Sequence, residues 1–166
     1  MMSYKNYEVV EAAQLDYSET VQAYLAANVE LDRGLGYLVE QLEERGMADR
    51  TVIVISSDHF PYGLDSDGSL NYLSELYGFD VENNIQRDHN RLIIWSGSLE
   101  DADPIVVDDP VSAVDILPTL LNLFGAEWDS RLLPGRDVFS EAQPVAFNLS
   151  YDWVSNLGVY FADTST

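Results

Sequence analysis

Two short apolar runs without polar alternation are the clearest pattern in the chain. The first covers 51–55, is rich in β-branched residues and leads into Ser56-Ser57-Asp58-His59. The second is Leu92-Ile93-Ile94-Trp95. Uniformly apolar runs of this length are typical of strands that are buried on both faces, as in parallel sheets. The sequence therefore predicts two core strands, at 51–57 and 92–95.

Residues 18–46 have the periodicity of a long helix that precedes the first strand. Ser18 is a suitable N-cap, and Gly46 is suited to the position after the last helical residue. The apolar positions that recur at helical spacing are Val21, Tyr24, Leu25, Val29, Leu35, Leu38, Val39 and Leu42. Gly34 and Gly36 should each cost about 1 kcal/mol relative to Ala. We expect the close approach of another backbone to explain them.

Short elements separated by loops are expected in the rest of the chain. They are a connecting segment at 1–17, a short helix at 69–77, a short strand at 105–107, a helix at 115–124 and a terminal strand pair at 145–149 and 158–161. Asp115 is the expected N-cap of its helix, because Pro118 then falls in the first turn, where no backbone donor is needed. Alternating helices and core strands indicate an α/β fold with a mainly parallel sheet flanked by helices, and with a small C-terminal antiparallel element.

The composition is that of one strongly acidic domain. The chain has 166 residues, of which 46% are hydrophobic, and 29 acidic against 8 basic residues give a net charge of −21. A nucleic-acid partner is excluded, because it requires a basic surface. No apolar run is long enough to cross a membrane, and no signal peptide is recognisable. The absence of cysteine excludes disulfides and thiolate metal sites.

Asp58 and His59 are candidate metal ligands, because they directly follow the first predicted strand. In open α/β sheets ligands bind beyond the carboxyl ends of the strands, and carboxylate and imidazole are both common metal ligands. Two ligands are fewer than a catalytic site needs, and the same pair can instead cap a turn or bond to the backbone. His89, the other of the two histidines, is a candidate substrate contact or ligand, or an exposed loop residue. In a parallel sheet it would lie at the far end of its strand.

Other catalytic patterns are not found. Ser56 and Ser57 lack the Gly-x-Ser-x-Gly turn of a serine hydrolase, and no Gly-rich phosphate loop is present. Arg131 and Arg136 can meet an anion, although internal ion pairs are the expected role in so acidic a chain. The three tryptophans are expected to pack in the core or at its rim.

Several segments of the chain form an ordered set that carries a family resemblance. They are 24–28 with Asp32, 51–54 followed by Asp58 and His59, 89–95, 114–120, and 129–137. Together they resemble the sulfatase-type catalytic domain of lipoteichoic acid synthases and related phosphoglycerol transferases, which belong to the alkaline phosphatase superfamily.

The resemblance implies that residues 1–166 are the C-terminal portion of a sulfatase-like catalytic domain. It implies that Asp58 and His59 bind a divalent cation, typically Mn²⁺. The family uses a Thr nucleophile, which would lie upstream of this chain, as would most substrate contacts. No catalytic nucleophile is therefore assigned here, and His89 is the one candidate for substrate binding.

The implied activity of the intact parent is metal-dependent transfer of phosphoglycerol from an anionic glycerophospholipid such as phosphatidylglycerol. Such a parent would be membrane-anchored and extracytoplasmic, at the cell envelope. This chain alone is expected to be soluble and inactive, and to self-associate through exposed strand edges and apolar faces. Two alternatives stay open: a sulfate or phosphate ester hydrolase of the same superfamily, and a non-catalytic domain that binds a cation or a partner.

Overall fold

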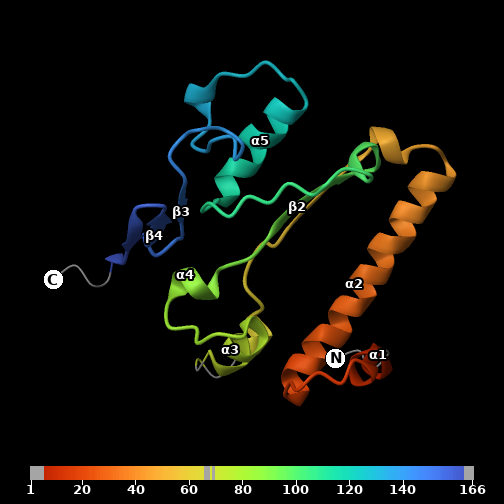
Figure 1. The fold of residues 1–166 in the computed structure, drawn as a ribbon. Helices are drawn as coiled ribbons and strands as arrows, with labels where there is room; N and C mark the ends of the chain where they lie inside the picture. Colours follow the sequence, from red (N-terminus) through yellow and green to blue (C-terminus); the bar gives the residue numbers. More distant parts are fainter. Residues whose placement is uncertain (1–5, 66–67, 69, 163–166) are drawn as a thin grey trace. The chain divides into compact units, whose positions relative to one another are not determined.

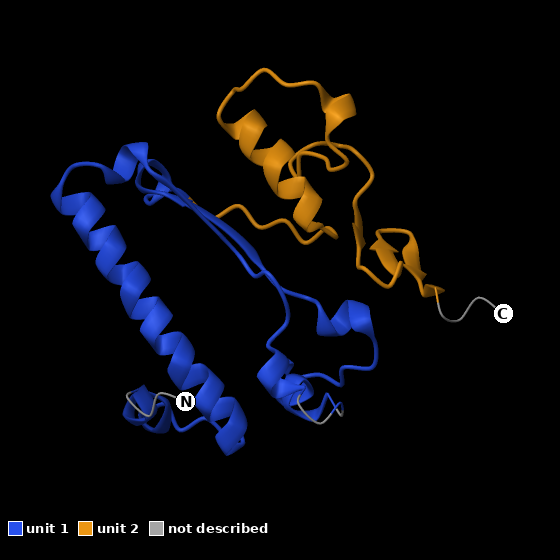
Figure 2. Ribbon diagram, turned by 180° about the vertical axis from the view of Figure 1, so that it is seen from behind, with its two compact units in different colours: residues 1–102 blue, residues 103–166 orange. Residues whose placement is uncertain are grey.

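The computed structural model describes residues 6–65, 68 and 70–162, and the chain divides into unit 1, Met1–Ala102, and unit 2, Asp103–Thr166 (Figures 1 and 2). The helices and strands of unit 1 are α1 (Tyr7–Ala12), α2 (Glu19–Glu44), β1 (Val52–Ser56), α3 (Asn71–Tyr77), α4 (Asn84–Arg87) and β2 (Leu92–Ser96). Those of unit 2 are α5 (Ile116–Leu123), β3 (Val145–Phe147), β4 (Trp153–Ser155) and β5 (Gly158–Tyr160).

The long helix predicted before the first strand is confirmed as α2. The Ser18 hydroxyl accepts a hydrogen bond from the Val21 amide at 3.4 Å, as an N-cap should. At the other end Gly46 has φ +61°, and the Met47 amide donates to the Leu42 carbonyl at 2.8 Å. This is a Schellman ending, and it requires the left-handed conformation that glycine adopts without strain.

The core of unit 1 forms where the first turns of α2 meet α3 and the loop that follows β1. Val21, Leu64, Leu73 and Val81 make its buried cluster. The Ser18 hydroxyl also donates to a Glu75 carboxylate oxygen at 2.7 Å, which links α2 to α3. Helix α1, in the segment expected to be a simple connection, packs against α2. The first part of α2 is therefore fixed on two sides.

Strands β1 and β2 form an antiparallel ribbon, in which Val52 pairs with Ser96 and Ser56 with Leu92. The predicted strands are confirmed, but the mainly parallel sheet is not found: the strands of the described residues pair only antiparallel. Burial on both faces is also wrong, since Val54 is 37% and Ile93 52% exposed. An apolar run predicts that a strand forms. It does not predict whether the strand pairs parallel or antiparallel, or which elements cover its two faces.

Three smaller elements differ from expectation. The short helix expected at 69–77 begins at Asn71, and Ser69 lies outside the described residues. The strand expected at 105–107 does not form, and α4, which the sequence did not predict, lies just before β2. Among the described residues no helix is both long and apolar enough to cross a membrane.

Unit 2 combines α5 with a three-stranded antiparallel sheet in the order β3-β4-β5. The antiparallel C-terminal element is confirmed, although the two predicted strands do not pair with each other. Both pair with β4, which lies between them: Ala146 of β3 and Val159 of β5 are each opposite Val154.

The N-terminus of α5 is held by a buried carboxylate. Asp115 is at the N-cap position of α5, as expected, but its dihedral angles are helical and its side chain makes no cap hydrogen bond within α5. Its carboxylate instead accepts the amides of Ser112 at 2.9 Å and Arg136 at 2.8 Å, so that one acid joins two segments. Gly135 passes so close that an added Cβ would lie 2.0 Å from the Val114 carbonyl oxygen. Only glycine permits this approach.

Candidate metal centre

Asp58 and His59 lie just beyond the last residue of β1, as the sequence predicted. The His59 Nε2 atom is 3.4 Å from an Asp58 carboxylate oxygen, and the Asp58 side chain is 89% exposed. Both candidate ligand atoms therefore face one another at the surface of the ribbon's end. They are close enough to bind one cation together.

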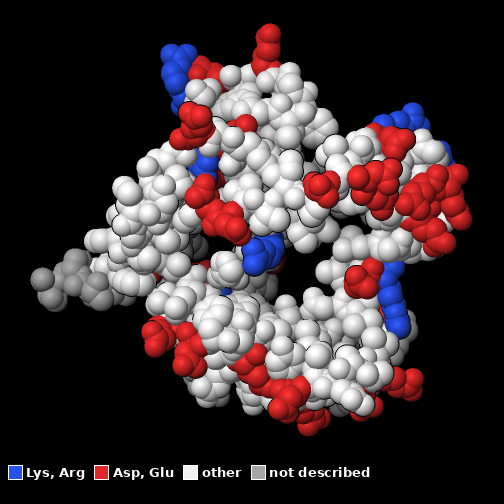
Figure 3. Space-filling view, viewed as in Figure 1, with Lys and Arg blue, Asp and Glu red and all other residues white. Residues whose placement is uncertain are grey.

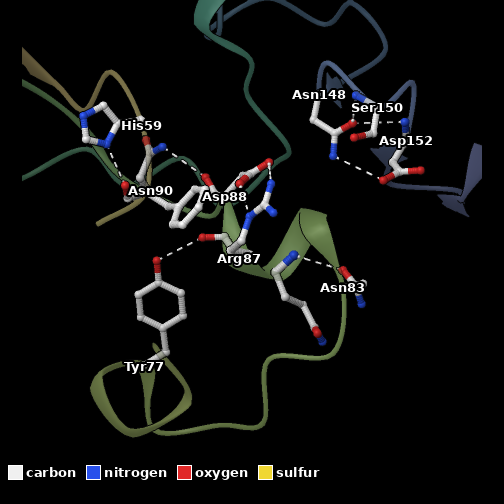
Figure 4. Close-up of polar contacts among 11 residues, drawn as sticks. His59, Tyr77, Asn83, Arg87, Asp88, Asn90, Asn148, Ser150 and Asp152 are labelled. Carbon is white, nitrogen blue, oxygen red and sulfur yellow. Dashed lines mark hydrogen bonds and ion pairs between the residues drawn. The ribbon is translucent and has the colours of Figure 1, made fainter. Parts of the chain in front are cut away.

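The other nitrogen of His59 fixes which ring atom is available. His59 Nδ1 lies 2.6 Å from the Phe60 carbonyl oxygen (Figure 4). Since a carbonyl can only accept, this contact places a proton on Nδ1, and in the neutral imidazole Nε2 then carries the lone pair on the side of Asp58. Metal-binding histidines usually donate their second ring nitrogen to a carbonyl or carboxylate in this way. The pair thus has the local geometry of metal ligands.

The antiparallel pairing brings the segment before β2 to the same end of the ribbon. Ser56, which precedes the candidate ligands, is paired with Leu92, which follows His89. The inference that His89 lies at the far end of its strand is therefore wrong, because it assumed parallel strands. His89 is exposed, and its neighbour Asn90 donates to the Asp88 carbonyl at 3.1 Å (Figure 4).

These acidic and imidazole side chains do not complete a metal site by themselves. Within the part of the chain that the structure describes, no three His, Cys, Asp or Glu side chains are close enough to hold a metal ion. Asp58 and His59 would supply two ligands at most, and a catalytic cation needs at least one more from the protein. The pair fits part of a metal site and not the whole of one.

Arg87, at the end of α4, contacts Asp88 and the ring of Phe60, the residue after His59. Its guanidinium bonds to both carboxylate oxygens of Asp88, at 2.8 and 3.3 Å, and lies 4.3 Å from the centroid of the Phe60 ring. The hydrogen bond to Asp88 raises the pKa of Arg87. The backbone carbonyl of Arg87 accepts the Tyr77 hydroxyl at 3.1 Å, and burial raises the pKa of that phenol.

The aromatic contacts around His59 were not predicted from the sequence. Tyr62 stacks on the imidazole with ring centroids 4.1 Å apart, and Phe60 meets Tyr62 edge-on at 4.7 Å. The signal available was the spacing His59-Phe60-Pro61-Tyr62, in which a proline fixes the backbone between two aromatic rings.

In unit 2 the cationic candidates serve mainly the fold. Arg131 forms the internal ion pair that was expected, 2.6 Å from Asp129, and this contact lowers the pKa of the Asp129 carboxyl. The Arg136 side chain reaches the carbonyls of Asp137 and Ser140 at 3.4 and 3.5 Å. Acidic side chains are spread over the visible face in Figure 3 rather than gathered at one site.

Comparison with known proteins identifies the family of the chain. The family model described as Sulfatase matches residues 3–126. The chain belongs to the sulfatase family. Its fold class is accordingly the α/β fold of the alkaline phosphatase superfamily, of which the described residues show helices and small antiparallel sheets.

Curated relatives of this sulfatase-family chain are lipoteichoic acid synthases. It is 26% identical to the lipoteichoic acid synthase-like protein YvgJ of Bacillus subtilis (strain 168), over 89% of this chain and 24% of that protein. It is 30% identical to the lipoteichoic acid synthase of Staphylococcus aureus (strain USA300), over 74% of this chain and 18% of that protein. The chain thus matches about a quarter or less of these relatives. No solved structure matches it.

Proposed function

We propose that residues 1–166 form the C-terminal portion of a sulfatase-type catalytic domain that transfers phosphoglycerol from phosphatidylglycerol-type phosphodiesters. The names of the curated relatives support the reaction class. The observation that carries the proposal is the pair Asp58–His59, with Nδ1 bonded to a carbonyl and Nε2 facing the carboxylate. The parent would be an extracytoplasmic, membrane-anchored enzyme of the cell envelope.

Asp58 and His59 would hold a divalent cation, which we propose to be Mn²⁺. A bound cation at this position supplies charge neutralisation for the phosphate oxygens and lowers the pKa of an attacking hydroxyl. The chain's own residues hold and orient the ligands: β1 places them, and the Phe60 carbonyl keeps the proton on Nδ1. His89, which precedes β2 at the same end of the ribbon, is the proposed substrate contact.

The nucleophile is proposed to come from outside this chain. Thr119 is fully buried, and its hydroxyl donates to the Asp115 carbonyl and accepts the Val138 amide. Thr51 donates to the Met47 carbonyl at 2.8 Å, at the end of the ribbon opposite Asp58. The Thr119 hydroxyl is thus enclosed and fully bonded, and the Thr51 hydroxyl lies at the end of the ribbon away from His59. The chain alone is therefore proposed not to turn over a phosphodiester.

A sulfate or phosphate ester hydrolase is the second candidate, because the matching family model is that of the sulfatases. The chemical identity of the nucleophile separates the two. Threonine would support phosphoglycerol transfer, whereas Cys or Ser matured to formylglycine would support sulfate ester hydrolysis.

Calorimetric titration of Mn²⁺ into the chain tests the proposal. We expect saturable binding that both Asp58→Ala and His59→Ala abolish, since each removes one of the two ligands. With 29 acidic residues the chain will also bind cations loosely. Asp49→Ala is the matched control, because Asp49 lines a shallow hollow at the other end of the ribbon.

Three outcomes bear on the proposal. Binding lost in both ligand variants but kept in Asp49→Ala supports it. Equal loss in all three variants, or in none, assigns the binding to the acidic surface and overturns the site. Release of glycerol phosphate by the isolated chain would overturn the external nucleophile.

A further inference from the structure

One face of the His59 ring is covered by Tyr62. The two rings are nearly parallel, with an interplanar angle of 9° and centroids 4.1 Å apart. His59 is 44% exposed, so few other contacts restrain it. An imidazole on the surface can turn about two side-chain bonds, and the stack limits that freedom while leaving the edge with Nε2 open to Asp58.

Tyr62 is itself held from the core of unit 1. Its ring meets Phe60 edge-on at 87°, and Phe60 packs against the buried cluster around Leu64 and Leu73. The backbone of Tyr62 belongs to a short turn in which the Leu64 amide donates to the Pro61 carbonyl at 2.9 Å. Leu64 is 2% exposed, so this turn is anchored. The backbone that carries the stacking ring is therefore anchored, and the ring itself, 60% exposed, contacts Phe60 and His59.

The guanidinium of Arg87 contacts the other side of this aromatic cluster, at Phe60. The Arg87 guanidinium lies 4.3 Å from the centroid of Phe60, and Asp88 holds it through two hydrogen bonds. Phe60, Tyr62 and Arg87 thus form a connected set of contacts that ends on the imidazole, and we call these three residues the His59 brace. The brace runs from α4 to the loop after β1.

We propose that Tyr62 is a positioning residue for His59, which keeps the Nδ1 proton on the Phe60 carbonyl and the Nε2 lone pair toward Asp58. This inference rests on the proposed function, since the orientation matters because a cation would bind there. It goes further in naming a residue that binds neither cation nor substrate. The stack on Tyr62 fixes the orientation of the His59 ring, and the hydrogen bond to the Phe60 carbonyl keeps the proton on Nδ1. Together they favour the neutral form that is protonated on Nδ1.

The proton's position can be measured without metal. The chain has two histidines, so a ¹⁵N-histidine NMR spectrum is sparse, and a His89→Gln variant assigns it. The spectra of the native chain and the variants are compared for the neutral form of the ring. We expect His59 in the native chain to hold its proton on Nδ1. Tyr62→Ala should move it toward the mixture seen in free imidazoles, and Tyr62→Phe, which keeps the stacking ring, should not.

The affinity for Mn²⁺ gives a second measurement. Loss of a residue that orients a histidine ligand typically weakens metal binding by about 10-fold or more. We expect this for Tyr62→Ala, with Tyr62→Phe within about 2-fold of the native chain. Tyr37→Ala, at an exposed tyrosine of α2, is the matched control and should leave both readouts unchanged.

The two measurements separate failure of this proposal from failure of the proposed function. If Tyr62→Ala leaves the His59 proton on Nδ1, the positioning role is overturned, whatever the metal does. If Mn²⁺ binding is indifferent to Asp58→Ala while Tyr62→Ala still redistributes the proton, the metal site is overturned and the positioning of the ring stands.

Discussion

At the scale of single residues, Asp115 joins two segments of unit 2 through a buried carboxylate. It is 3% exposed, and its two carboxylate oxygens accept the Ser112 and Arg136 amides. Thr119, one turn later, donates to the Asp115 carbonyl and accepts the Val138 amide at 3.0 Å. These two side chains close the loop 129–138 onto the start of α5.

Replacing Asp115 by Asn tests that role. The amide group can accept through one oxygen only, so one backbone N–H that is now bonded would face a donor. An unsatisfied buried donor costs about 1–3 kcal/mol, and we expect the free energy of unfolding to fall by that amount. Urea denaturation followed by circular dichroism measures it.

Asp129→Asn is the matched control for Asp115→Asn. Asp129 also accepts backbone and arginine donors, but on an exposed loop. Water can replace those partners, so we expect a much smaller change. Equal losses of unfolding free energy in the two variants would contradict the prediction, because they would mean that burial does not strengthen the contribution of the Asp115 hydrogen bonds.

The residues of the candidate site were only partly predictable. Asp58 and His59 follow from a strand end and two ligand types, both of which are local features of the sequence. The position of His89 depended on strand direction, which no local pattern encodes. Tyr62 was missed because stacking on a neighbouring ring is decided by a turn that Leu64 anchors in the core. That anchoring is tertiary information.

At the scale of elements, end signals were more informative than periodicity. Ser18 and Gly46 mark the two ends of α2 as expected. A capping side chain and a left-handed residue each determine a helix end through contacts within one turn. The β1 and β2 runs identified strands but suggested the wrong sheet. Antiparallel order follows from the path of the intervening chain, which folds into α3 and α4 and returns to the end at which β1 finished.

The two glycines within α2 lead to a prediction of increased stability. Close approach of another backbone was expected to explain them, yet among the described residues nothing lies within 4 Å of a Cβ added at Gly34 or Gly36. Ala is favoured over Gly in a helix interior by about 0.5–1 kcal/mol. Gly34→Ala and Gly36→Ala should each raise the free energy of unfolding by that amount in denaturant melts.

A contrasting substitution makes the glycine prediction specific. Gly135→Ala, in unit 2, places a methyl group against the Val114 carbonyl and should destabilise the chain. If Gly34→Ala and Gly36→Ala also destabilise it, α2 has a neighbour in solution that the described residues do not provide.

At the scale of the whole molecule, apolar strands and a high negative charge oppose each other. Both faces of the β1–β2 ribbon carry apolar residues that remain partly exposed, such as Val54 and Ile93. Among the residues that the structure describes, each of its two strands pairs with one neighbour, so an edge is open on either side. Such edges and faces favour association, whereas a net charge of −21 disfavours it.

We expect the chain to self-associate more strongly as salt rises. Screening shortens the range of the repulsion from about 14 Å at 0.05 M to about 4 Å at 0.5 M salt, while the apolar contacts persist. Sedimentation velocity at these two salt concentrations measures the change. Ile93→Lys, which places a charge on the ribbon, should reduce it, and Leu31→Lys, at an exposed leucine of α2, should not. A monomer at both concentrations contradicts the prediction.

The placement of the candidate ligands and most of their brace within five consecutive residues, 58–62, bears on the order in which the molecule assembles. Contacts between near neighbours close very short loops and cost little chain entropy, whereas pairing β1 with β2 must first bring distant segments together. The carboxylate, the imidazole and the Phe60 carbonyl can therefore meet early, while the ribbon beneath them is still forming. The stacking of Tyr62 follows later, because its turn is anchored by Leu64 in the core. The candidate pair Asp58–His59 can therefore be in place before the surroundings that would complete a site.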